Sequence, residues 1–232
     1  MTIIDYPQNI IIMERIIEHI RGKLKKYDVD FLRFVDISDL SPEVNRGCGC
    51  AVLFGIPLPG DFIRLINVGE HSTYNWFDIL EERVKRLADF IADYLVEQGY
   101  TAYSQSEEEQ LRRQTYDESV FRSRLPHKTL AVRAGLGWIG KNDLCNFHDY
   151  GCAVSMCSVL TDAPFESVHF NPQEPKCGKC NVCRDICPTS AISGTMWHPE
   201  ADRDELIDTS KCILCLKCLA GCPFTKSKRK SQ

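Results

Sequence analysis

The sequence lacks a long apolar run, and it lacks the apolar stretch of a secretory signal and a twin-arginine signal. Its isoleucine-rich start is interrupted by Glu14 and Arg15 and is too short to span a bilayer. It also lacks a strong charge of one sign, because 28 Lys and Arg face 32 Asp and Glu. These absences argue against a membrane protein and against nucleic-acid binding over the whole surface. We therefore expect a cytoplasmic protein without a membrane partner, its thiols reduced or bound to metal.

Cysteine, by contrast, is abundant, with 13 residues in a chain of 232. Eight of them form two copies of one pattern, C-x2-C-x2-C-x3-C-P. The first copy comprises Cys177, Cys180, Cys183 and Cys187, and the second comprises Cys212, Cys215, Cys218 and Cys222. This is the run of bacterial two-cluster ferredoxins, in which the fourth cysteine ligates the other cluster. We therefore expect Cys177, Cys180, Cys183 and Cys222 to hold one [4Fe–4S] cluster, and Cys212, Cys215, Cys218 and Cys187 to hold the second.

Two other uses of these cysteines are open to consideration. Zinc sites use pairs at C-x2-4-C spacing, and a triple with a trailing Cys-Pro, present twice, is more than zinc needs. Disulfides need an oxidising compartment, to which nothing in the sequence points. The spacing therefore favours two iron–sulfur clusters.

The remaining chain is typical of a globular protein, with 44% hydrophobic and 26% charged residues. Apolar residues at helical spacing predict amphipathic helices over residues 8–26 and 76–98, the second with Asn75 as N-cap and Gly99 just past its end. Its outer face carries two i,i+4 pairs, Glu81 with Lys85 and Glu82 with Arg86. Apolar runs predict strands, and we expect a loop or an exposed helix over 107–118. The expected strands cover residues 31–37, 51–58, 100–104 and 153–160, with 62–68 pairing beside 51–58.

A glycine-rich stretch occupies residues 134–142, reading A-G-L-G-W-I-G-K-N. Its glycines satisfy G-x-G-x-x-G and nearly satisfy a P-loop. Both nucleotide-binding motifs must follow a strand and open a helix, whereas residues 128–134 are predicted to form a helix that ends at Gly135. We interpret the glycines as a tight turn in which the backbone closely approaches another group.

This stretch, the L-T-D-A-P sequence at 160–164 and the run from Cys177 to Pro188 resemble the epoxyqueuosine reductase family. The resemblance implies an α+β fold, in which a nitroreductase-like α/β sandwich is followed by a two-[4Fe–4S] bacterial ferredoxin-like domain. We place the first domain, expected to bind cobalamin, at residues 1–165 and the second at residues 166–232. Reductive dehalogenases share this layout and resemble the chain less.

The resemblance also implies a chemistry, in which electrons pass through the two clusters and reduce the cobalt of a bound cobalamin. The electrons would come from a low-potential donor such as a ferredoxin or flavodoxin. The acceptor would be a small molecule or a corrinoid protein. The positions carried over to the cofactor are Lys128, Gly135, Gly137, Trp138, Ile139, Gly140 and Lys141.

Two departures from the family disfavour tRNA as the substrate. Family members carry C-terminal helical repeats that help to hold tRNA, whereas this sequence ends shortly after its second Cys-Pro, like a short form. They also carry a proton-donating aspartate where this chain reads V-F-R-S-R at residues 120–124. The nearest candidates for the missing acid are Tyr116, Asp117 and His127.

Two further hypotheses remain. The chain could be an electron carrier, or a reductant of corrinoid proteins, without a substrate of its own. Alternatively, its five other cysteines could form an additional metal or redox site, although their spacing fits no strong ligand pattern. In a strand, Cys152 and Cys157 would point to opposite faces. These five are Cys48, Cys50, Cys145, Cys152 and Cys157.

Overall fold

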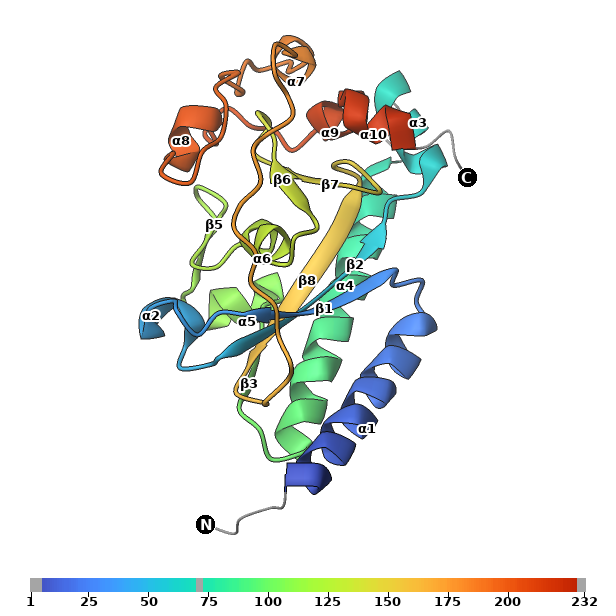
Figure 1. The fold of residues 1–232 in the computed structure, drawn as a ribbon. Helices are drawn as coiled ribbons and strands as arrows, with labels where there is room; N and C mark the ends of the chain where they lie inside the picture. The colour runs from blue at the N-terminus through green and yellow to red at the C-terminus, as the bar shows by residue number, and fades with distance from the viewer. Residues whose placement is uncertain (1–5, 70–72, 229–232) are drawn as a thin grey trace.

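The computed structural model describes residues 6–69 and 73–228 and is built on a four-stranded antiparallel sheet of order β1-β2-β8-β3 (Figure 1). The central strands β2 and β8 are buried along nearly their whole length, which explains their continuous apolar sequence. The four strands are β1 (Phe31–Asp36), β2 (Cys50–Pro57), β8 (Val154–Thr161) and β3 (Ala102–Ser104).

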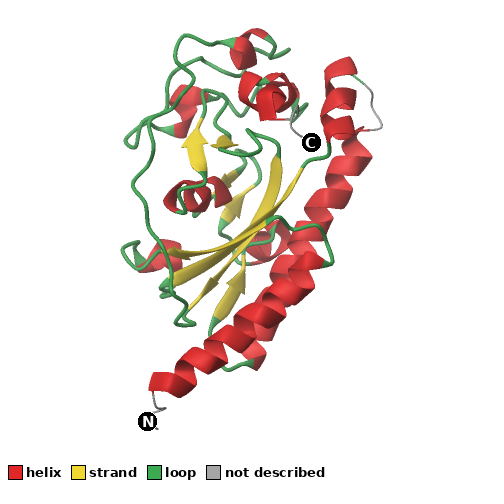
Figure 2. Ribbon diagram, turned by 45° about the vertical axis from the view of Figure 1, so that its right-hand side comes forward, coloured by secondary structure: helices red, strands yellow, loops and turns green. Residues whose placement is uncertain are grey.

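Two long helices, α1 (Tyr6–Lys25) and α4 (Thr73–Glu97), cover one face of this sheet (Figures 1 and 2). Their apolar stripes pack on Val52, Phe54 and Val159, as the helical spacing predicts. Helix α4 begins before Asn75, so the prediction of an N-cap there is wrong. Gly99 follows the helix with a φ of 90°, a backbone conformation that glycine adopts without strain.

The opposite face is covered by α6 (His127–Arg133) and by the hairpin of β6 (Gly137–Ile139) and β7 (Cys145–Phe147). Helix α6 ends before Gly135, whose φ of 69° turns the chain into β6. The glycine-rich stretch therefore follows a helix and opens a strand, the reverse of a nucleotide-binding loop. A small hairpin of β4 (Tyr116–Asp117) and β5 (Arg122–Ser123) lies before α6, and α5 (Glu107–Arg112) precedes it.

One predicted strand is wrong, because residues 62–68 lie in helix α3 (Gly60–Val68). Phe62, Ile63 and Ile66 are buried from a single helical face. A short apolar run has no periodicity that separates a strand from a buried helix. Gly69, with a φ of 76°, ends this helix.

The cysteine-rich part follows an extended segment and lies at one end of the sheet (Figure 1). Its short helices are α7 (Val182–Asp185), α8 (Arg203–Leu206), α9 (Lys217–Gly221) and α10 (Pro223–Lys228); a further short helix, α2 (Pro42–Asn45), follows β1. Leu206 joins the core on the α6 side, and Leu219 and Ala220 join the core on the α4 side. The two parts thus share their hydrophobic cores, and the domain boundary near residue 166 stays a prediction. Among the described residues, no helix combines the length and apolarity needed to cross a bilayer.

Candidate functional site

The eight cysteines of the two runs gather into two groups of four. Cys187 lines one small cavity of about 150 Å³ together with Cys212, Cys215 and Cys218. In the second group, the thiol of Cys183 lies within electrostatic range of Cys177, Cys180 and Cys222. Each group therefore contains the four cysteines of one predicted ligand set, with the fourth cysteine exchanged between the runs.

Left-handed backbone turns shape both cysteine loops. Gly178 lies between Cys177 and Cys180 with a φ of 51°, and Leu214 and Leu216 flank Cys215 with φ of 52° and 56°. Leucine rarely adopts this conformation, and such strain is concentrated at functional sites. Among the described residues, those of the two cysteine groups included, no three His, Cys, Asp or Glu side chains lie close enough to share one metal ion. A preformed zinc site would need that closeness, whereas the four ligands of a cube bind different irons.

The glycine-rich hairpin packs against the first cysteine loop. Lys141 Nζ donates to the carbonyl oxygen of Cys180 and to Asn181 Oδ1, both at 3.0 Å. Trp138 meets Phe224 edge-on, with ring centroids 5.1 Å apart. A side chain at Gly137 would place its Cβ 2.0 Å from the carbonyl oxygen of Asn146 on the facing strand. The hairpin therefore needs glycine for a close backbone approach, and it supports the cysteine module.

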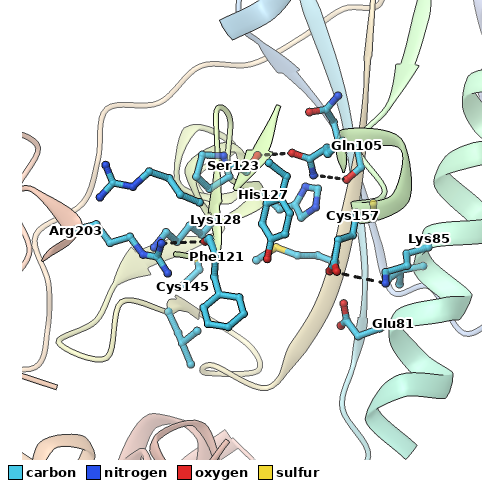
Figure 3. A pocket seen from close by; sticks show the side chains of 18 residues that line it. Glu81, Lys85, Gln105, Phe121, Ser123, His127, Lys128, Cys145, Cys157 and Arg203 are labelled. Atoms are coloured by element: carbon cyan, nitrogen blue, oxygen red, sulfur yellow. Dashed lines mark hydrogen bonds and ion pairs between the residues drawn. The ribbon is translucent and has the colours of Figure 1, made fainter. Parts of the chain in front are cut away.

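A pocket of about 320 Å³ lies between α4, β8, α6 and α8 (Figure 3). Of the cofactor positions carried over by the resemblance, only Lys128 lines it. Of the three acid candidates, Tyr116 and His127 line it, whereas Asp117 does not. Its remaining walls include Glu81, Val84, Lys85, Gln105, Glu107, Gln110, Phe121, Arg122, Ser123, Pro126, Leu144, Cys145, Met156, Cys157 and Arg203.

The electrostatic environments of the three acid candidates differ. Burial lowers the pKa of His127 to about 4, and its Nδ1 lies 2.9 Å from Ser158 Oγ, so the ring is neutral at pH 7. Burial raises the pKa of Tyr116, which keeps the phenol protonated. Hydrogen bonds from Ser119 lower the pKa of Asp117, an exposed residue that is ionised at neutral pH. Of these three candidates, only Tyr116 and His127 therefore lie where they can form a hydrogen bond to a molecule in the pocket.

Glu81 is an acid that the sequence analysis missed. We expected it on the outer face of α4, paired with Lys85, but Lys85 instead approaches Glu107 at 3.9 Å. The Glu81 carboxylate accepts a hydrogen bond of 2.6 Å from Ser155 Oγ, and burial raises its pKa. Figure 3 shows its side chain at the pocket wall. The second expected pair, Glu82 with Arg86, forms at 2.6 Å.

A thin wall separates this pocket from the cavity of the second cysteine group. Phe121, Leu144 and Arg203 line both spaces. Arg203 donates to the carbonyl oxygens of Val120 and Phe121 at 2.7 and 2.9 Å. The pocket and the second cysteine group are therefore neighbours across single side chains.

Asp143 forms ion pairs with two residues that line the pocket, Lys128 and Arg203. Its Oδ2 lies 2.5 Å from Lys128 Nζ and 3.1 Å from Arg203 Nε. Burial lowers the pKa of Lys128, and the charge of Asp143 opposes that shift. Nothing in the local sequence identifies this triad, because its members come from the loop after β6, from α6 and from α8.

The five other cysteines are all buried. Cys145 and Cys157 line the pocket, and Cys48 and Cys50 belong to the cores on opposite faces of the sheet. Cys152 lies before β8, so the argument from strand alternation does not apply to it; its Sγ donates to Asn146 Oδ1 at 3.0 Å. Burial raises the pKa of Cys48 to about 11 and that of Cys145 to about 12. These thiols therefore stay protonated at neutral pH.

Comparison with known proteins identifies the cysteine module. A family model described as a 4Fe-4S dicluster domain matches residues 176–226. The epoxyqueuosine reductase of Yersinia pestis is 30% identical to this chain over a match that covers 59% of the chain and 38% of that enzyme. The chain is similar in sequence to the epoxyqueuosine reductases. It spans less than half of the length of the curated relatives that it matches.

Solved structures with the same fold include two reductases. An epoxyqueuosine reductase with an epoxyqueuosine-modified tRNA stem loop matches with a TM-score of 0.57 and 18% identity, covering 95% of this chain and 67% of that one. A reductive dehalogenase, whose structure suggests a mechanism for B12-dependent dehalogenation, matches with a TM-score of 0.63 and 17% identity, covering 87% and 31%. At these identities the likeness concerns the fold alone. It agrees with the mixed helix and sheet architecture and the cysteine module expected from the sequence.

Proposed function

We propose that this chain is an iron–sulfur reductase that delivers electrons to an acceptor bound in the 320 Å³ pocket. The observation that carries the proposal is the shared wall, because Phe121, Leu144 and Arg203 line both the pocket and the cavity of the second cysteine group. [4Fe–4S] clusters, when bound, exchange single electrons at potentials that their surroundings set. The second group thus lies beside the acceptor, and the first group, with its exposed loop at Lys176 and Lys179, faces the electron donor.

The pocket supplies a proton source for this reduction. We propose Glu81 as the proton donor, because burial raises its pKa and its carboxyl group lines the pocket. General acids work best when their pKa lies near the working pH. Tyr116 and neutral His127 remain candidates for hydrogen bonding to the acceptor. Lys128 and Arg203 share the single carboxylate of Asp143, so this side of the pocket is electropositive and suits an acceptor that gains negative charge.

The finer proposal is that the acceptor is a cobalamin, in a nitroreductase-like sandwich. Its support is the fold likeness to a reductive dehalogenase linked to B12. The pocket would enclose only part of a cobalamin, because its volume of 320 Å³ is at the lower end of small-molecule sites, roughly 300 to 1,000 Å³. Apolar Val84 and Met156 beside the amide of Gln105 suit one edge of a corrin ring with its amide groups. A cobalamin, when bound, supplies a strongly reducing cobalt centre, and the protein supplies position and charge.

The proposed partners follow from this assignment. A low-potential ferredoxin or flavodoxin would supply the electrons, and a small molecule or a corrinoid protein would receive them. We do not propose tRNA as a substrate, because residues 120–124 carry no carboxylate at the position where the family donates a proton.

Binding of cobalamin to the anaerobically purified protein tests the proposal. We expect the visible corrinoid bands to shift on addition of the wild-type chain. Met156→Trp, which fills the pocket, should abolish the shift. Ile79→Trp, at an exposed site that is on the same helix as Glu81 but outside this pocket, should retain it.

The outcomes separate the parts of the proposal. Cluster absorbance without a shift of the corrinoid bands would contradict the proposal of a bound cobalamin and would favour an electron carrier without a substrate of its own. Iron and sulfide well below eight of each per chain would remove the electron path itself.

A further inference from the structure

The side chain of Asn146 has an unexplained donor beside the first cysteine group. Asn146 lies on β7 and is only 1% exposed. Its Nδ2 is buried and has no hydrogen-bond partner among the described residues. Its Oδ1 lies 3.0 Å from Cys152 Sγ and 3.5 Å from Cys222 Sγ. Buried amide donors are nearly always satisfied, so one without a partner indicates a missing acceptor.

The position of this amide is enforced by its surroundings. A side chain at Gly140 would bring its Cβ to 2.4 Å from Asn146 Nδ2. Backbone pairing of Asn146 with Trp138 holds the residue in the β6–β7 hairpin. The glycine-rich stretch therefore makes room for this one amide next to Cys222.

Metal binding at Cys222 changes what the amide can do. A ligating cysteine is a thiolate, which accepts hydrogen bonds and cannot donate them. The Oδ1 atom then has no proton to accept from Cys222, and a half-turn of the amide brings Nδ2 to the same place, 3.5 Å from the sulfur. In the turned orientation an N–H group faces the sulfur of Cys222, one of the four cysteines of the first group.

We propose that Asn146 is a positioning residue that donates an N–H···S hydrogen bond to the first cluster and raises its reduction potential. A reduced cluster carries one more negative charge than an oxidised one, so a donor stabilises the reduced form more. Cys152 belongs to the same arrangement, because its Sγ bridges Asn146 and the Nδ2 of Asn142, which lies 3.5 Å away. This inference rests on Cys222 being a cluster ligand and does not depend on the acceptor in the pocket.

The test is an anaerobic redox titration of the full chain, followed by electron paramagnetic resonance of the reduced clusters. Asn146→Leu keeps the volume and removes the donor. We expect the oxidised-to-reduced ratio of one cluster to rise about tenfold at fixed potential, which is a midpoint about 59 mV lower for a one-electron couple. The other cluster should be unchanged. Asn45→Leu is the matched control, because Asn45 is also buried but its amide donates to the carbonyl oxygens of Ile37 and Leu40, not to a cysteine.

Iron content separates the possible results. Eight irons with both midpoints unchanged in Asn146→Leu would overturn the inference. If that variant loses four irons, its first cluster has no midpoint to compare, and the wild-type chain must be tested instead. Pulsed resonance on protein carrying ¹⁵N-labelled asparagine should then show coupling of a side-chain amide nitrogen to a reduced cluster. Absence of that coupling would equally overturn it, whereas fewer than eight irons in the wild type would contradict the cluster assignment instead.

Discussion

Replacement of Asp143 by asparagine tests the wall between the pocket and the second cysteine group. The Asp143 carboxylate lies 2.5 Å from Lys128 Nζ and 3.1 Å from Arg203 Nε. Asp143 has a φ of 59°, a left-handed conformation that asparagine also tolerates. The substitution therefore removes the charge and leaves the backbone and shape almost unchanged.

The loss in free energy of unfolding expected for Asp143→Asn follows from the burial of the three charged side chains. The Asp143 side chain is 9% exposed, and those of Lys128 and Arg203 are 23% and 22% exposed. Removal of one partner from a buried ion pair costs about 3–5 kcal/mol, because the remaining charge is uncompensated. The residual exposure of the two cations places this case at the lower end, about 3 kcal/mol. For a chain of this length the melting temperature should fall by about 6–12 °C.

Thermal unfolding of the anaerobic holoprotein at pH 7 and one scan rate is the assay. Asp208→Asn is the control, because Asp208 pairs with Lys211 at 2.8 Å on the surface and should matter by less than about 1 kcal/mol. Adding Arg203→Gln to Asp143→Asn should cost less than the sum of the single changes, since both act in one network. A loss of melting temperature no larger than that of the control would refute the reasoning.

Three further predictions concern the acid, the hairpin and the clusters. Burial raises the pKa of Glu81, so the stability that Glu81 contributes is present below the ordinary glutamate pKa and is lost as pH rises through the raised value. Glu81→Gln should therefore gain stability relative to the wild type as pH rises. Melting temperatures of the two proteins that run parallel against pH would contradict this. Gly137→Ala should unfold at a much lower denaturant concentration than Gly49→Ala, because an added Cβ would meet backbone at 2.0 Å in the first case and nothing within 4 Å in the second; equal midpoints would be inconsistent with the close approach. Cys187→Ser should lose about four of eight irons in a metal assay, whereas Cys157→Ser should keep all eight, and equal iron in both variants would count against the ligand assignment.

Sequence patterns that depend on near neighbours were sufficient for much of the fold. The periodic apolar faces of α1 and α4 predicted both helices, and Gly135 correctly marked the end of α6. The run at residues 62–68 failed because a helix and a strand can both bury Phe62 and Ile66, and only packing decides between them. The cysteine spacing identified the dicluster domain because thiolates that wrap one cluster must lie at short, regular separations.

By itself, then, the sequence determined the cysteine chemistry and the helical faces, since both depend on residues a few positions apart. The tertiary structure alone decided where the acceptor pocket lies. Glu81, His127 and Arg203 meet there from α4, α6 and α8, and no local pattern relates them. The role of Glu81 was likewise decided by packing. Helical spacing would pair Glu81 with Lys85, but α4 packs against β8 so that Glu81 accepts a hydrogen bond from Ser155 and its carboxyl group lines the pocket. Long-range packing sets these contacts, because it selects among pairings that the local sequence leaves equally open.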